Sequence, residues 1–184
     1  MATAEQTDDL DVIAFLEAQH EEVRRLFNQV KQAGPEERAE LFQCLVRALA
    51  VHETAEEEVL HPAARRLGGD AIVEARIAEE SKSKQALADL EKMGAADPRF
   101  DEALELFRLD VERHATNEES EEFPLVRSQT SEGELAAMGD QLRLAEGIAP
   151  THPHPHGPDG ALGNLVVGPF AAIADRVRDA LGAK

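Results

Sequence analysis

The sequence has no tryptophan and no tyrosine, and it has only 7 phenylalanines and one cysteine. Because aromatic residues favour strands, their scarcity favours helices. The lone Cys44 excludes an internal disulfide and argues for a reducing compartment. No apolar run approaches the length of a membrane span, and the N-terminus lacks the basic and apolar segments of a secretory signal. We therefore expect a cytoplasmic protein with no membrane partner.

Basic residues are also few. The chain of 184 residues has 19 Lys and Arg against 37 Asp and Glu, for a formal net charge of -18. Such a surface repels nucleic acid and anionic membranes, so neither is an expected partner. Bound cations could balance part of the acidic excess.

Four stretches carry apolar residues at alternating steps of three and four, which is the spacing of one helix face. They cover residues 7 or 8 to 33, 35 to 67, 70 to 93 and 100 to 126, with possible kinks at Pro62 and Pro124. The connections between them are short, which implies antiparallel neighbours. We predict an all-α fold, with an up-down-up-down four-helix bundle over residues 1–128.

Residues 129–184 are predicted to form a C-terminal helical extension that packs on the bundle. Ser131 and Glu134 form a capping-box pattern that opens a fifth helix to about residue 146. A proline-rich segment with three histidines follows, which we interpret as a solvated, extended tail. A last amphipathic helix is predicted over residues 166–181. The three histidines are His152, His154 and His156.

Metal-binding side chains interrupt all four apolar stripes. A buried His or Glu needs a partner that neutralises or coordinates it. The second and fourth helices share the pattern His-x3-Glu-Glu, and a four-residue offset places imidazole and carboxylate on one face. Imidazole with bridging carboxylates suits paired iron or manganese. The candidate metal ligands are His20, His52, Glu56, Glu80, His114 and Glu118.

Other polar residues near the stripes have less defined roles. Lys84 lies one turn beyond Glu80, and we predict for it a buried ion pair or a hydrogen bond to a metal ligand, because a protonated ammonium cannot itself coordinate a metal. Glu80 could either bind the metal or be a solvated residue within a run of Glu and Lys, and the sequence leaves both open. We expect a structural or gating role for His61, which lies off the His52 stripe and pairs better with Glu57 or Glu58. We favour a position on a solvated acidic face for three further residues, and a contact with the metal or its ligands stays open for each. These residues are Glu53, Glu57 and Glu119.

This arrangement of ligands over four helices resembles the hemerythrin-like family, also called the HHE cation-binding domain, over about residues 8–128. The resemblance implies a non-haem di-iron centre, with two iron ions bridged by carboxylates and an oxygen species. By matching position it implies the following ligands: His20, His52, Glu56, His114 and Glu118.

The resemblance leaves two points open. Glu119 rivals Glu118, which we prefer because it continues the apolar stripe through His114. The third helix has Glu80 and Lys84 where the family usually supplies histidine. A more carboxylate-rich site generally favours redox chemistry over reversible carriage of dioxygen.

Three functions are compatible with these residues. The first is a di-iron protein that binds, senses or processes dioxygen, peroxide, nitric oxide or iron itself. The second is a di-iron enzyme that decomposes peroxide, as a catalase does. The third is a helical interaction scaffold with a structural metal, which explains poorly why ligands interrupt every stripe. The residues leave open whether the protein is an enzyme.

Overall fold

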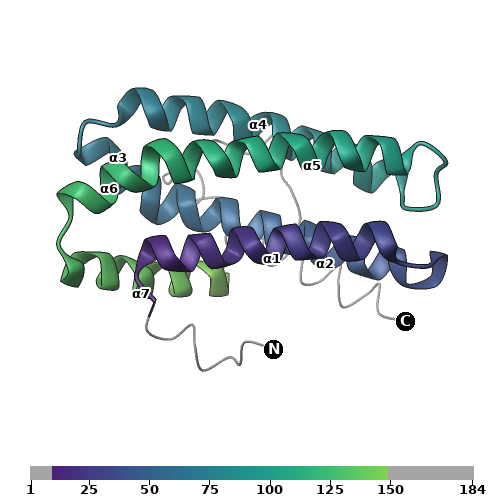
Figure 1. The fold of residues 1–184 in the computed structure, drawn as a ribbon, viewed down its shortest axis with the longest axis horizontal. Helices are drawn as coiled ribbons and strands as arrows, with labels where there is room; N and C mark the ends of the chain where they lie inside the picture. Colours follow the sequence, from purple (N-terminus) through teal and green to yellow (C-terminus); the bar gives the residue numbers. More distant parts are fainter. Residues whose placement is uncertain (1–9, 149–184) are drawn as a thin grey trace.

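The computed structural model describes residues 10–148, and this part of the chain is a helical bundle (Figure 1). The predicted all-α bundle is confirmed. In Figure 1, α4 and α5 lie together on one side of the bundle and α1 and α2 on the other, and each helix packs against its sequence neighbour. The four long helices are α1 (Val12–Gln32), α2 (Pro35–Ala55), α4 (Asp70–Met93) and α5 (Phe100–Asn117).

The helix ends follow from local chemistry. Helix α1 begins at Val12, later than the predicted residue 7 or 8, because Asp11 caps it: the Asp11 side chain accepts a hydrogen bond of 2.9 Å from the backbone N–H of Ala14. Pro35 starts α2 at a position where a missing N–H costs nothing. The turn before α4 and the C-terminus of α4 use Gly68 and Gly94, whose positive φ angles of 84° and 77° suit glycine.

Two π-helical turns interrupt the long helices near their C-terminal ends. Turn η2 (Glu56–Leu60) joins α2 to α3 (His61–Arg66), and η3 (Glu118–Glu122) joins α5 to α6 (Phe123–Gln129). In each turn an N–H donates to a carbonyl five residues earlier, from His61 to Glu56 and from Phe123 to Glu118. A proline without an N–H follows each turn, so Pro62 and Pro124 are accommodated within continuing helices and end neither of them.

The core is divided into two apolar clusters. One contains Leu16, Leu60 and Phe123, and the other contains Phe27 and Phe107. The buried histidines and carboxylates described below lie on the same helices between these clusters. The fold therefore encloses a polar layer within an apolar bundle.

Helix α7 (Glu132–Ile148) packs on α1 and α2 and adds Leu135 and Leu142 to the first apolar cluster. The predicted capping box is confirmed: the Ser131 N–H donates to Glu134 Oε2 at 3.0 Å. The histidine tract at residues 152–156 and the predicted helix over residues 166–181 lie outside the described residues. In the described part of the chain, no helix is long and apolar enough to cross a membrane.

Candidate metal centre

All six predicted ligands lie in the buried polar layer. They come from six different elements, and the most exposed residue among them, His114, has only 8 % of its surface accessible. Burial of so many ionisable groups in one place requires mutual compensation or a bound cation. The elements and residues are α1 with His20, α2 with His52, η2 with Glu56, α4 with Glu80, α5 with His114 and η3 with Glu118.

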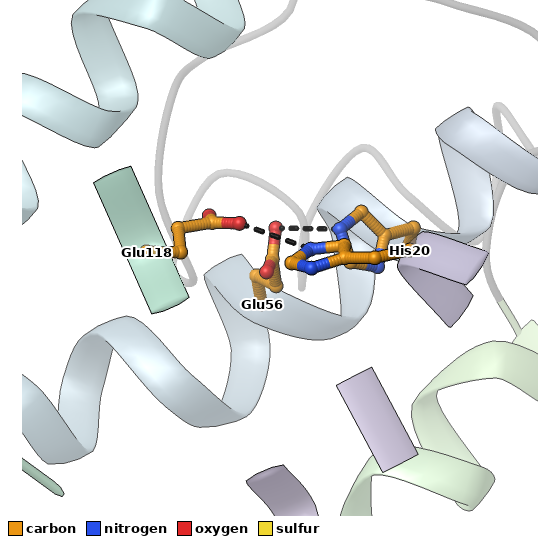
Figure 2. A group of neighbouring side chains, drawn as sticks. His20, Glu56 and Glu118 are labelled. Carbon is orange, nitrogen blue, oxygen red and sulfur yellow. Dashed lines mark ion pairs between the residues drawn. The ribbon is translucent and has the colours of Figure 1, made fainter. Parts of the chain in front are cut away.

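The six residues form two groups that share two carboxylates. In each group, one ligand atom per residue lies within 4.8 Å of all the others. The first group adds two histidines to Glu56 and Glu118, and the second adds one histidine and Glu80 to the same pair. Figure 2 shows Glu56 between His20 and Glu118, all three directed toward one another. The groups are His20, His52, Glu56, Glu118 and Glu56, Glu80, His114, Glu118.

Each histidine is held so that its Nε2 atom faces the cluster. The Nδ1 atom of His20 lies 2.8 Å from a carboxylate oxygen of Glu119. The same atom of His52 lies 2.8 Å from the amide oxygen of Gln19. For His114, the partner is a carboxylate oxygen of Glu79 at 3.0 Å. Because these oxygens accept a hydrogen bond from the Nδ1–H group, the lone pair of Nε2 is left for a metal, as in many metal sites.

The atoms that face inward lack hydrogen bonds. Both carboxylate oxygens of Glu56 and Glu118, and Nε2 of His20 and His114, are buried without a hydrogen-bond partner. They lie close together all the same, with His20 Nε2 at 3.2 Å and His114 Nε2 at 3.0 Å from Glu118 oxygens. Buried polar atoms are normally satisfied. This set of nitrogen and oxygen donors therefore fits a pair of iron ions, which prefer such ligands.

The pKa values of three of these groups, His52, Glu56 and His114, are strongly perturbed in the protein without metal. Burial lowers the pKa of His52 to about 3. Burial and the neighbouring Glu118 and Glu80 raise the pKa of Glu56 well above its usual range. For His114, the carboxylate of Glu118 outweighs burial and raises the pKa. The cluster therefore retains protons in the absence of metal, and metal binding must release them.

Two cations border the carboxylates. The Lys84 ammonium pairs with Glu57 and lies 3.9 Å from both Glu53 and Glu80. The predicted buried ion pair of Lys84 is thus present. Burial raises the pKa of Glu53 to about 8, against the opposing effect of Lys84.

His61 is the second cation, and our expectation for its partners was wrong. Its Nε2 lies 2.7 Å from Glu80 and its Nδ1 lies 2.9 Å from Glu122, whereas we expected Glu57 or Glu58. The π turn places residues five apart on one face, so His61 follows Glu56 around the helix. Although burial lowers its pKa, the two carboxylates outweigh burial and raise it to about 10.

Comparison with known proteins identifies the family. Residues 11–126 match the model of the hemerythrin HHE cation binding domain. The chain belongs to the hemerythrin HHE cation-binding domain family. It is 29 % identical to an uncharacterized hemerythrin-like protein of Schizosaccharomyces pombe, over 87 % of this chain and 81 % of that protein. Membership of this family makes the chain a helical metal-binding protein.

Two further similarities are more limited. A DNA nickase of a Nostoc species is 25 % identical over 75 % of this chain, but the chain spans only 40 % of that protein. In the crystal structure of a hemerythrin HHE cation binding domain-containing protein from Mycobacterium kansasii, the fold is alike, with a TM-score of 0.68 at 21 % identity. That likeness covers 75 % of this chain and 86 % of the other, and it shows the fold.

Within the hemerythrin HHE fold, the structure also brings in three polar residues that the sequence analysis did not name for the site. Gln19 and Glu79 orient histidines, and Glu122 faces His61. Glu119, which we considered as a rival ligand, lies against Nδ1 of His20. The sequence did contain one indication that Glu122 belongs near the site. Glu122 follows Glu118 by four residues, just as Glu118 follows His114, so all three lie on one face of the helix. The structure places Glu118 at the centre of the cluster and Glu119 on the outer side of His20.

Proposed function

We propose that this protein holds two non-haem iron ions and uses them to bind and process oxygen species, with peroxide as the reactant. The observation that carries this proposal is the pair of four-residue groups that share Glu56 and Glu118. Two shared carboxylates are what a pair of adjacent cations needs as bridges. With a single structural ion, one of the two groups of buried donor atoms would have no bound cation.

The composition of the cluster favours redox chemistry over reversible carriage of dioxygen. Three carboxylates and three histidines, which would be neutral as ligands, would surround the proposed ions. Anionic oxygen ligands stabilise the oxidised state of iron, which opposes release of intact dioxygen. When bound, the iron pair would supply the electrons for reduction of an O–O bond and a Lewis acid to bind it.

The side chains around the ions have separate tasks in this proposal. Glu119, Gln19 and Glu79 fix the imidazole orientations through Nδ1. The charges of Lys84 and His61 offset part of the excess of carboxylates. Each of these groups would act on the metal through its ligands.

Glu53 is the candidate proton donor. Its side chain is 12 % exposed and lines the cavity that also contacts His20 and His52. With its pKa raised to about 8 by burial, the Glu53 carboxyl holds its proton at neutral pH. A carboxylic acid with a pKa near the working pH is suited to protonating an oxygen that leaves an O–O bond.

Metal analysis together with an ultraviolet-visible spectrum tests this proposal. We expect about two irons per chain, with charge-transfer bands of a bridged iron pair, in the wild-type protein. The variant His52→Ala, His114→Ala removes one nitrogen from each group and should lose both the iron and the bands. Glu58→Gln is the matched control, because Glu58 lies in the same π turn as Glu56 and belongs to neither group.

Two results would contradict the proposal. The first is a wild-type protein that takes up no iron after anaerobic reconstitution, and the second is equal loading in the double variant. Peroxide and dioxygen are then compared on the loaded protein. Repeated turnover of peroxide agrees with the proposal, whereas a stable, reversible dioxygen adduct would assign carriage instead.

A further inference from the structure

A cavity of about 370 Å³ adjoins the proposed metal centre. Side chains of α1, α2, α4 and α5 line it, and its buried end is formed by His20, His52 and His114. Its other end reaches the surface, where the exposed Asn28 and the partly exposed Arg108 contribute to the lining. The cavity therefore connects solvent to the side of the centre on which three histidines lie.

The cavity is far larger than a small oxidant requires. A water molecule occupies about 30 Å³ in the liquid, and a cavity of about 150 Å³ can hold benzene. The volume of about 370 Å³ therefore exceeds the needs of dioxygen or hydrogen peroxide roughly tenfold. It falls in the range of pockets that bind small organic molecules, which begins at about 300 Å³.

The walls and the ends of the cavity differ in polarity. The apolar part of the wall is formed by Val23, Phe27, Leu49 and Val111. Glu53 adds a hydrogen-bonding group near the histidines. A molecule that matches this lining has an apolar body and one polar end.

The mouth does not favour anions. Arg24 pairs with Glu112 across the mouth at 3.1 Å, and Arg108 pairs with Glu105 at 2.7 Å. Each cation is thus already neutralised by a carboxylate, and the chain as a whole has a net charge of -18. An anion would be repelled at long range and would find no unpaired cation among the residues that line the mouth. An anionic occupant is therefore disfavoured.

We propose that this cavity binds a neutral organic hydroperoxide of about ten non-hydrogen atoms. The inference rests on the proposed function and names its substrate class. The hydroperoxide end would lie at the histidines and Glu53, and the organic body would lie against the apolar wall. Reduction breaks the O–O bond with two electrons and two protons and yields an alcohol and water. When bound, a pair of ferrous ions would supply the two electrons and become ferric, and Glu53 and water would supply the two protons. An external one-electron reductant would then be needed before each further turnover.

Binding of cumyl alcohol, an unreactive neutral product analogue, tests this inference. Titration calorimetry on the metal-free and the iron-loaded full chain should give saturable binding. Benzoate, an anion of similar size, should bind at least about tenfold more weakly. The variant Val111→Phe fills the cavity and should weaken cumyl alcohol binding by about tenfold or more. Leu106→Phe, on the same helix but with 62 % of its surface exposed, is the matched control and should bind as the wild type does.

A second variant guards against misfolding of the first. Asn28→Trp places a large ring at the exposed mouth and should weaken or slow binding without disturbing the core. Absence of saturable binding to the wild type, or equal binding by all variants, overturns the inference. Iron content is measured on the same samples. A protein that loads iron but binds no cumyl alcohol refutes the substrate class alone, and a protein that loads no iron refutes the proposed function.

Discussion

Lys84 is the cation on which a set of buried carboxylates depends. Its ammonium pairs with Glu57 and lies 3.9 Å from Glu53 and Glu80, and its own side chain is only 17 % exposed. Glu57 and Glu80 are almost completely buried, at 3 % and 1 %. Substitution by methionine keeps the length of the side chain and removes its charge. Glu57 and Glu80 then stay buried but lose this cation, and Glu80 keeps its contact with His61.

The expected loss of stability is large. Removal of one partner from a buried ion pair costs about 3–5 kcal/mol, because the remaining charge stays out of water. For a chain of this size, 1 kcal/mol corresponds to about 2–4 °C in Tm, so Lys84→Met should lower Tm by roughly 10 °C. The prediction applies to the metal-free protein, in which no other added cation offsets the carboxylates.

Urea denaturation followed by circular dichroism measures this loss, and two further variants make it specific. Lys82→Met is the matched control on the same helix, where the side chain is exposed, and should change stability by no more than about 0.5 kcal/mol. Adding Glu57→Gln to Lys84→Met removes one uncompensated charge and should recover part of the loss. If Lys84→Met and Lys82→Met destabilise equally, the carboxylates do not depend on this cation and the reasoning fails.

Three further predictions follow from other contacts. Gly139→Ala should cost about 1–3 kcal/mol in urea unfolding, because its Cβ would lie 2.6 Å from the carbonyl oxygen of Leu10. Gly133→Ala, in the same helix and with no neighbour within 4 Å, should be neutral or stabilise by up to about 1 kcal/mol. Burial lowers the pKa of His61, but the hydrogen bonds to Glu122 and Glu80 outweigh burial and raise the pKa from 6.5 to about 10. Protonated His61 therefore stabilises the metal-free protein fully below pH 6.5, and this stabilisation is lost as the pH rises through 10. Unfolding curves measured over a series of pH values should show this decline, and the decline should be smaller in His61→Gln. Glu119→Ala removes the acceptor of His20 Nδ1 and should weaken iron binding by about 10–100-fold in a chelator competition, with an unchanged affinity refuting the orienting role.

Much of the local structure is encoded in short segments. The period of the apolar residues predicts the long helices, and Ser131 with Glu134 predicts the start of α7. The positions of the candidate ligands are encoded in the same way, because His52 and Glu56 lie one turn apart on a face that must be buried. The start of α1 was predicted too early, since the acidic residues before Asp11 also resemble a first helical turn.

The sequence by itself determined the helices, the faces they bury and the side chains able to bind metal, because each of these depends on residues within a few turns of one another. The tertiary structure decided which side chains meet. His61 contacts Glu80 and Glu122, which are 19 and 61 residues away, and His20 contacts Glu119 at a separation of 99 residues. Such pairs depend on the rotation and depth of each helix in the bundle, and the π turns shift both. Local periodicity gives the buried face of each helix only approximately and does not give its depth relative to the other helices, so only packing of the whole bundle sets the partners of each buried charge.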